Sequence, residues 1–366
     1  MAMKFPELGA YMLPGHIFDP REAIAETKAA RDLGLGSIWV SERFSAKNCD
    51  VLSGAAAMLT DEMGIAAGLI QNLTLRHPVV TAGYCATMAK LTGDRFALGV
   101  GRGTASFSDA TGTPRINFKV MGDYIDVLRK LWRGETVDYE GPLGTYKGLR
   151  LGVELEKTPP VLVAAMGDKT LEWAGARADG VLLNSLWTPD AVERSARLIR
   201  KGAEEAGRDP DEVRIWTILM TACDVPEENY LNWIVRRINT YLVFPPLFDG
   251  ICDGNGWDKS LAPGLRAALA EMDGPKAEGT MGDEATTRDL DNLRRMADLY
   301  PREWIEQGCA VGSGADGARA IAARIDAGAH SVLFHGSHPQ ALGGVVRAWA
   351  DIRPARLDAL SPNPGF

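Results

Sequence analysis

The sequence predicts an α/β protein of the TIM-barrel class, a ring of eight parallel strands with intervening helices. Three observations support this. Short apolar runs alternate with helical patterns along most of the 366 residues. Three junctions, at 32–41, 175–185 and 326–337, each end a helix at small residues and enter an apolar strand. Polar loops follow the strands, where a barrel carries its active site.

The clearest single unit is the stretch 158–185. Val161–Ala164 is an apolar run, 169–176 has helix-forming residues, and Val181–Leu183 is a second apolar run. Two strands joined through a helix must lie parallel, because a short hairpin cannot connect them. The turn at 166–169 then directs free backbone N–H groups at a helix start, which suits an anion such as phosphate. The alternative is an ordinary strand–helix turn that binds nothing.

The other elements of the first half follow in order. Asp19, Pro20 and Glu22 predict a helix start with Asp19 as N-cap, and Gly34 predicts its end. The segment 101–117, rich in Gly, Ser and Thr, is expected to be a long loop. Expected strands are 10–13, 37–40, 65–69 and 96–100, expected helices are 19–33, 51–60, 79–91 and 120–131, and 137–149 is a small β excursion.

The second half completes the ring around one interruption. Thr188 and Pro189 cap a helix, and 214–221 is the seventh strand. Residues 225–307 are read as a mostly helical insertion, because Pro and Gly pairs break the rhythm there and it resumes afterwards. The closing elements are a helix at 318–325, an eighth strand at 331–334 and a helix at 339–350. We therefore expect a single domain over residues 1–366.

Composition limits the function classes. A net charge of -8 and a pI near 5.3 argue against nucleic acid as the main partner. No apolar run approaches the roughly 20 residues of a membrane span, and the start of the chain lacks the core of a signal peptide. The five cysteines are scattered and never spaced as CxxC, so we expect neither a disulfide framework nor a zinc site, and a cytoplasmic location.

The sequence contains only incomplete motifs for dinucleotide binding and for metal binding. Gly99 and Gly101 begin a dinucleotide fingerprint, but Thr104 stands where its third glycine belongs. His335 and His338 could hold a metal, yet no third ligand is evident, so pocket lining or a backbone hydrogen bond is expected instead. A metal-dependent hydrolase is therefore a remote alternative.

The chain resembles the luciferase-like flavin and deazaflavin oxidoreductases, especially the branch that uses coenzyme F420. The stretches that carry the resemblance are 37–44, 68–78, 91–101, 161–184 and 312–335. The resemblance implies a TIM barrel, a homodimer formed by helices near strands two to four, and a small-molecule substrate. It also implies a non-prolyl cis peptide at Leu69–Ile70 behind the cofactor ring, with Asn72 at the ring edge. Gly101 would line the cofactor site, and Ala165, Met166, Gly167, Asp168 and Lys169 would form the phosphate-binding turn.

The chain departs from that branch at two positions. Glu42 and Arg43 stand where many members carry Asp and His, and Thr104 stands near where several carry Glu. We expect Glu42, Arg43 and Thr104 near the reacting face, although a structural ion pair is an equal alternative for the first two. Arginine stays protonated at neutral pH and is a poor general base.

The leading hypothesis is thus an F420-dependent oxidoreductase that moves a hydride between the deazaflavin and a small organic substrate. An FMN-dependent monooxygenase of the same fold is the first alternative. A barrel that binds a ligand without catalysis is the second.

Overall fold

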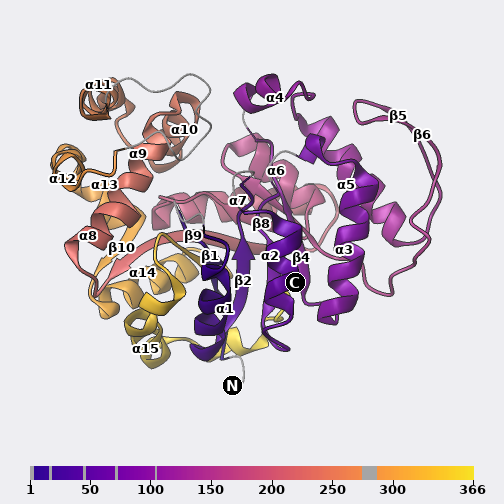
Figure 1. The fold of residues 1–366 in the computed structure, drawn as a ribbon, viewed down its shortest axis with the longest axis horizontal. Helices are drawn as coiled ribbons and strands as arrows, with labels where there is room; N and C mark the ends of the chain where they lie inside the picture. The colour runs from indigo at the N-terminus through magenta and orange to yellow at the C-terminus, as the bar shows by residue number, and fades with distance from the viewer. Residues whose placement is uncertain (1–3, 16–18, 44–46, 71–72, 104, 274–286) are drawn as a thin grey trace.

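The eight predicted strands close into a parallel barrel. The computed structural model describes residues 4–15, 19–43, 47–70, 73–103, 105–273 and 287–366. Strands pair in the order β9-β11-β1-β2-β3-β4-β7-β8, and a further pairing of β8 with β9 completes the ring (Figure 1). The barrel strands are β1 (Phe5–Met12), β2 (Leu35–Val40), β3 (Gly64–Ala67), β4 (Phe96–Val100), β7 (Val161–Ala165), β8 (Gly180–Leu183), β9 (Arg214–Cys223) and β11 (Ser331–His335). The predicted TIM barrel is confirmed.

Helices pack on the outside of this ring and bury their apolar faces against it. The predicted stripe on α5, from Val120 to Leu131, is buried, and the Thr188 hydroxyl caps α7 as expected. The Asp19 cap is wrong: its carboxylate accepts the Arg21 N–H in the preceding turn, so the first helix begins two residues later than a cap at Asp19 requires. The outer helices are α1 (Glu22–Asp32), α2 (Cys49–Ala57), α3 (Pro78–Thr92), α5 (Phe118–Trp132), α6 (Asp168–Arg177), α7 (Pro189–Glu205), α14 (Gly314–Asp326) and α15 (Gly343–Ile352).

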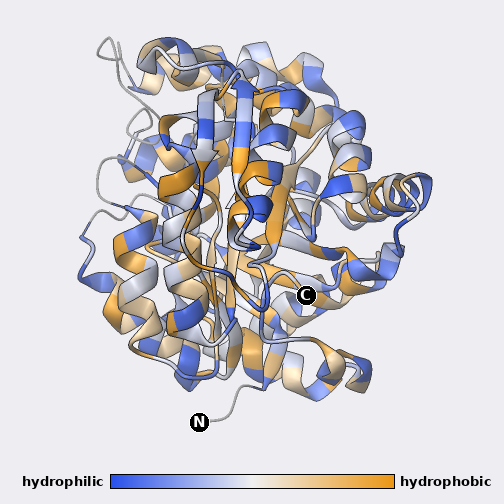
Figure 2. Ribbon diagram, turned by 90° about the vertical axis from the view of Figure 1, so that its right-hand side faces the viewer, coloured by the Kyte–Doolittle hydropathy of each residue, from blue (hydrophilic) through white to orange (hydrophobic). Residues whose placement is uncertain are grey.

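Side chains fill the inside of the barrel. The rings of Trp39 and Trp216 meet edge-on, with centroids 4.8 Å apart. Gly9 faces them, and a Cβ there would lie 2.8 Å from the Trp39 indole nitrogen. The ribbon coloured by hydropathy shows apolar residues along these inner strands and polar residues outside (Figure 2). Because the interior is packed, a ligand has room only beyond the strand ends.

The amino ends of the strands are closed by the segment 361–366. Buried Arg214, at the start of β9, donates to main-chain oxygens of Ser361, Asn363 and Phe366 and to that of Pro6. Burial lowers the pKa of its guanidinium to about 9, which leaves it charged at pH 7. This charge holds the segment 361–366 against the first and seventh barrel strands.

The predicted insertion after the seventh strand is helical. It folds beside the barrel, at upper left in Figure 1. It comprises α8 (Glu227–Tyr230), a π-helical turn (Leu231–Val235), α9 (Arg236–Leu242), α10 (Pro245–Asn255), α11 (Ala262–Asp273), α12 (Leu290–Leu299) and α13 (Arg302–Gly308). None of the helices described in the structure is long and apolar enough to cross a membrane.

Two further elements were not predicted. A short helix, α4 (Ala105–Thr111), lies in the expected loop 101–117, where burial of Phe107 stabilises a sequence of low helix propensity. Strand β10 (Cys309–Gly312) extends the sheet beside β9. The predicted β excursion is the hairpin of β5 (Val137–Gly141) and β6 (Gly144–Leu149). Short 3₁₀ turns cover Leu73–Leu75, Pro210–Glu212, Lys259–Leu261, Pro339–Ala341 and Ala355–Ala359.

Candidate active site

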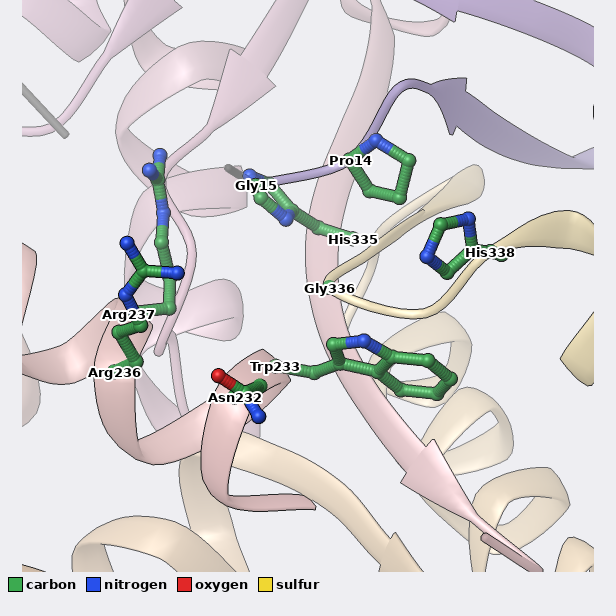
Figure 3. Close-up of a pocket in the computed structure, with 9 residues that line it drawn as sticks. All are labelled: Pro14, Gly15, Asn232, Trp233, Arg236, Arg237, His335, Gly336 and His338. Carbon is green, nitrogen blue, oxygen red and sulfur yellow. The ribbon is translucent and has the colours of Figure 1, made fainter. Parts of the chain in front are cut away.

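A cavity of about 110 Å³ opens at the carboxyl ends of the barrel strands. It lies between the turns that follow β1 and β11 and the π-helical turn and α9 of the insertion (Figure 3). His335 and His338, expected from the sequence to line a pocket, both line this one. The described lining residues are Pro14, Gly15, Asn232, Trp233, Arg236, Arg237, His335, Gly336 and His338.

The insertion contributes the cationic wall of the cavity. Asn232 and Trp233 precede Arg236 and Arg237 by four residues, so all four lie on one face. A π-helical turn at this junction is typical of functional sites. Both arginines are buried, and no Asp or Glu occurs among the described lining residues. The wall therefore suits anionic or strongly hydrogen-bonding groups.

Tyr11 connects the cavity to the end of the third strand. Its ring packs edge-on against His335 with centroids 5.2 Å apart, and its hydroxyl donates to the Gly68 carbonyl at 2.7 Å. Burial raises the pKa of Tyr11, and the positive charges of Arg43 and Arg237 act in the opposite direction. The charges of Arg43 and Arg237 thus both act on this hydroxyl, although the two residues belong to distant parts of the chain.

A carboxylate–histidine contact lines the same cavity. His338 Nδ1 lies 2.7 Å from Glu26 Oε1, and the Glu26 side chain on α1 is fully buried. The other carboxylate oxygen accepts the Leu13 N–H at 2.5 Å. Lys47 Nζ donates to the Leu13 and Gly15 carbonyls, each at 2.7 Å, and so holds the same turn.

The cis peptide joins Gly68 to Leu69, so the prediction of Leu69–Ile70 is wrong by one residue. The bend falls at the glycine because a side chain there would collide with the Trp39 ring. Leu69 then lies against Gly101, where a Cβ would be 2.9 Å from Leu69 Cδ1. Ile70 is buried and its N–H donates to the Gly99 carbonyl at 3.0 Å. Gly99 and Gly101 therefore make room for Leu69.

Glu42 is anchored in an ion-pair network. Its fully buried carboxylate accepts from Arg76 at 2.6 Å, and Arg76 also pairs with Asp50 at 2.8 Å. The Glu42 N–H donates to the Leu69 carbonyl at 3.0 Å, so the residue also holds the end of the third strand. Arg43 donates to its neighbours, the Ser41 hydroxyl at 3.1 Å and the Glu42 carbonyl at 2.7 Å.

The predicted phosphate turn has the expected backbone geometry. Gly167 is the N-cap of α6 and offers no side-chain cap, and a Cβ added to it would have no atom within 4 Å. Asp168 pairs with Arg194, which offsets its negative charge. Met166 packs under Gly250 of α10, so the insertion reaches this turn.

The structure brings most predicted site residues to one end of the barrel. Asn72 and Thr104 lie outside the described residues. Sequence reasoning missed Tyr11, Glu26 and the two insertion arginines. Glu26 left a detectable signal, because it occupies the buried face of α1 with Ala23, Thr27 and Ala30. Among the described residues, no cluster of three or more His, Cys, Asp or Glu could hold a metal.

Comparison with known proteins places this geometry in context. A model of the luciferase-like monooxygenase family matches residues 3–331. The chain is 29% identical over 199 residues to a 5,10-methylenetetrahydromethanopterin reductase of Methanolobus tindarius, covering 54% of this chain and 60% of that one. It is 28% identical over 218 residues to an F420-dependent glucose-6-phosphate dehydrogenase of Mycolicibacterium gilvum, covering 56% and 65%. These matches thus span less than two thirds of either relative.

A solved structure shares the fold over nearly the whole chain. The coenzyme F420-dependent tetrahydromethanopterin reductase of Methanopyrus kandleri superposes with a TM-score of 0.77 at 21% identity. The superposition covers 96% of this chain and 99% of the reductase.

Proposed function

This chain belongs to the luciferase-like monooxygenase family, and on that basis we propose that it is an F420-dependent oxidoreductase acting on a small organic substrate. The observation that carries the proposal is the pair of sequence relatives named above. The dehydrogenase carries the F420 dependence in its name, and the structurally similar tetrahydromethanopterin reductase of Methanopyrus kandleri carries it too. The substrate would lie in the cavity between the barrel and the insertion.

The residues of this chain fit a deazaflavin that carries a phosphate. The amino end of α6, with open space at Gly167, offers backbone N–H groups to an anion. Leu69 and Ile70 would form the surface behind the ring, and Gly101 leaves room for Leu69. We assign Ala165 to Lys169 to the phosphate turn, and keep Asn72 at the ring edge as an expectation from the family resemblance.

The bound cofactor would supply hydride chemistry at its C5 atom. The protein would hold substrate and ring in register, which accounts for several kcal/mol of catalysis in well-aligned reactions. The insertion would exclude water from the cavity, and Arg43 and Arg237 would supply fixed positive charge near the reacting groups. Glu42 would position the third strand through its hydrogen bond to the Leu69 carbonyl.

Binding separates this proposal from the FMN-dependent alternative. The apoprotein is titrated with F420 and with FMN while the fluorescence of its tryptophans is followed. We expect saturable quenching by F420 and weak or absent quenching by FMN. Tight binding of FMN without binding of F420 would overturn the proposal.

Catalytic turnover of F420 separates the proposed oxidoreductase from a barrel that binds a ligand without catalysis. The protein loaded with oxidised or reduced F420 is offered a panel of alcohols, aldehydes and enones, and F420 absorbance is recorded. Cofactor oxidation or reduction by at least one compound is expected. Binding of F420 with no turnover across the panel would favour the non-catalytic alternative.

We also propose a homodimer formed through α2 and α3. Val51 on α2 and Met58, the residue that follows α2, are seven residues apart, and they are 69% and 74% exposed. Val80 and Leu91, eleven residues apart on α3, are also exposed. Each spacing brings its pair to one helix face, and an apolar surface of this kind is typical of an interface.

A further inference from the structure

We propose that His338, held by the buried carboxylate of Glu26, exchanges a proton with the substrate oxygen in this cavity. The inference rests on the proposed oxidoreductase function and names the acid–base group that this function requires. A hydride leaves or reaches carbon, so a proton must leave or reach the adjoining oxygen.

The carboxylate fixes the tautomer of the imidazole. We assign the proton of the 2.7 Å contact with Glu26 Oε1 to His338 Nδ1, because an ionised carboxylate can only accept a hydrogen bond. The neutral ring then has Nε2 as its acceptor, and the protonated ring has Nε2 as a donor. Among the described residues, none forms a hydrogen bond with His338 Nε2, and the ring lines the cavity (Figure 3).

The pair is rigidly held. Both Glu26 oxygens are engaged, one by His338 and the other by the Leu13 N–H. Trp233 packs on the imidazole with ring centroids 5.5 Å apart. A buried carboxylate on one ring nitrogen orients the ring and stabilises the imidazolium that forms when the other nitrogen takes a proton.

Other polar groups near the cavity suit this task less well. Arg43, Arg236 and Arg237 stay protonated at neutral pH and cannot cycle as acids and bases. The Glu42 carboxylate is bonded to Arg76. Lys47 donates to two carbonyls of the turn after the first strand, and the His335 ring packs against Tyr11, whose hydroxyl is committed to the Gly68 carbonyl. His338 combines a place on the cavity wall with a buried carboxylate on one ring nitrogen.

Oxidation of an alcohol would break two bonds. The carbon–hydrogen bond would break, and its electron pair would leave with the hydride for the oxidised deazaflavin that the proposed function supplies. The oxygen–hydrogen bond breaks, and the proton passes to Nε2 of His338 as the carbonyl forms. The alcohol would thereby be oxidised by two electrons and the deazaflavin reduced by the same two, while the imidazolium of His338 pairs with Glu26. Carbonyl reduction reverses each transfer.

The tautomer can be measured without a substrate. Nitrogen-15 NMR of histidine-labelled, F420-loaded protein should show His338 protonated on Nδ1. In Glu26→Gln the amide oxygen accepts the Leu13 N–H, the amide NH₂ faces Nδ1, and the proton should move to Nε2. An Nε2-protonated ring in the unsubstituted protein would overturn the inference.

Kinetics test the role itself with a substrate from the turnover panel. His338→Gln should lower kcat about 100-fold or more while the F420 dissociation constant changes less than twofold. Imidazole added to His338→Ala should restore part of the lost rate. The matched control is His330→Asn at the opposite end of the barrel, where burial lowers the His330 pKa to about 4 and its Nδ1 accepts the Ile215 N–H. This control should keep its kcat within twofold.

The role of His338 and the use of F420 fail in different experiments. Full turnover by His338→Gln with intact F420 binding would exclude His338 and leave the oxidoreductase assignment standing. Absence of F420 binding to the unsubstituted protein would remove the assignment itself.

Discussion

Individual side chains at the strand ends divide into those that hold the fold and those that face the cavity. Glu42 belongs to the first group, because Arg76 and the Cys49 N–H bond its carboxylate away from solvent. His338 belongs to the second. Glu42 was predicted to be a site residue because it follows a strand. Its pairing with Arg76, 34 residues later, has no local sequence signal.

Glu42→Gln should lower the free energy of unfolding by about 3 kcal/mol, because it breaks the ion pair of a fully buried carboxylate and leaves the partly buried Arg76 guanidinium without its nearest charge partner. Urea denaturation at pH 7 measures the change. The control is Asp50→Asn, which removes the more exposed partner of the same arginine and should cost less than about 1 kcal/mol. Equal effects of the two substitutions would contradict the structural role of Glu42.

Among the elements, α6 has an open amino end at Gly167 that could accept an anion. Gly167 has a φ of -83°, which any residue adopts, and a Cβ there meets no protein atom. The fold therefore does not demand glycine at this position, whereas a bound phosphate would.

Gly167→Val should weaken F420 binding at least tenfold and change the free energy of unfolding by no more than about 0.5 kcal/mol. Fluorescence titration and urea denaturation measure the two quantities. Gly264→Val on α11, also facing open space, is the control and should bind F420 normally. Unchanged affinity in Gly167→Val would remove this turn from the cofactor site.

The regular elements could be predicted because their causes are local. Strand 96–100 matches its predicted bounds, since a buried parallel strand reads as a continuous apolar run. Helix α4 and strand β10 could not be predicted, because burial of Phe107 and pairing with β9 stabilise them.

The candidate site was predictable only in part, because some of its contacts join residues far apart in the sequence. The turn at 166–169 is contiguous in sequence, and its place between a buried strand and the amino end of a helix was predicted correctly. The Glu26–His338 contact joins residues 312 positions apart, and no local pattern encodes it. The predicted cis bond was misplaced by one residue, because its position depends on contact between Gly68 and the Trp39 ring.

At the scale of the whole molecule, the proposed dimer gives the remaining prediction. Replacing Val51 and Met58 together by glutamate should convert the dimer to monomers, because charges would be buried at the interface. Light scattering coupled to size-exclusion chromatography measures the mass. Ile352→Glu, on the exposed part of α15, should leave the dimer intact. A monomeric unsubstituted protein at micromolar concentration would refute the interface.

The Arg214 contacts also bear on how the molecule is made. Residues 361–366 supply three of its carbonyl partners, and Asn363 additionally bonds the Phe96 carbonyl at the start of the fourth strand. A ribosome releases these residues after every barrel strand. During synthesis all eight barrel strands are therefore made before Arg214 can form these three hydrogen bonds. The nascent barrel reaches its final stability only when residues 361–366 have left the exit tunnel.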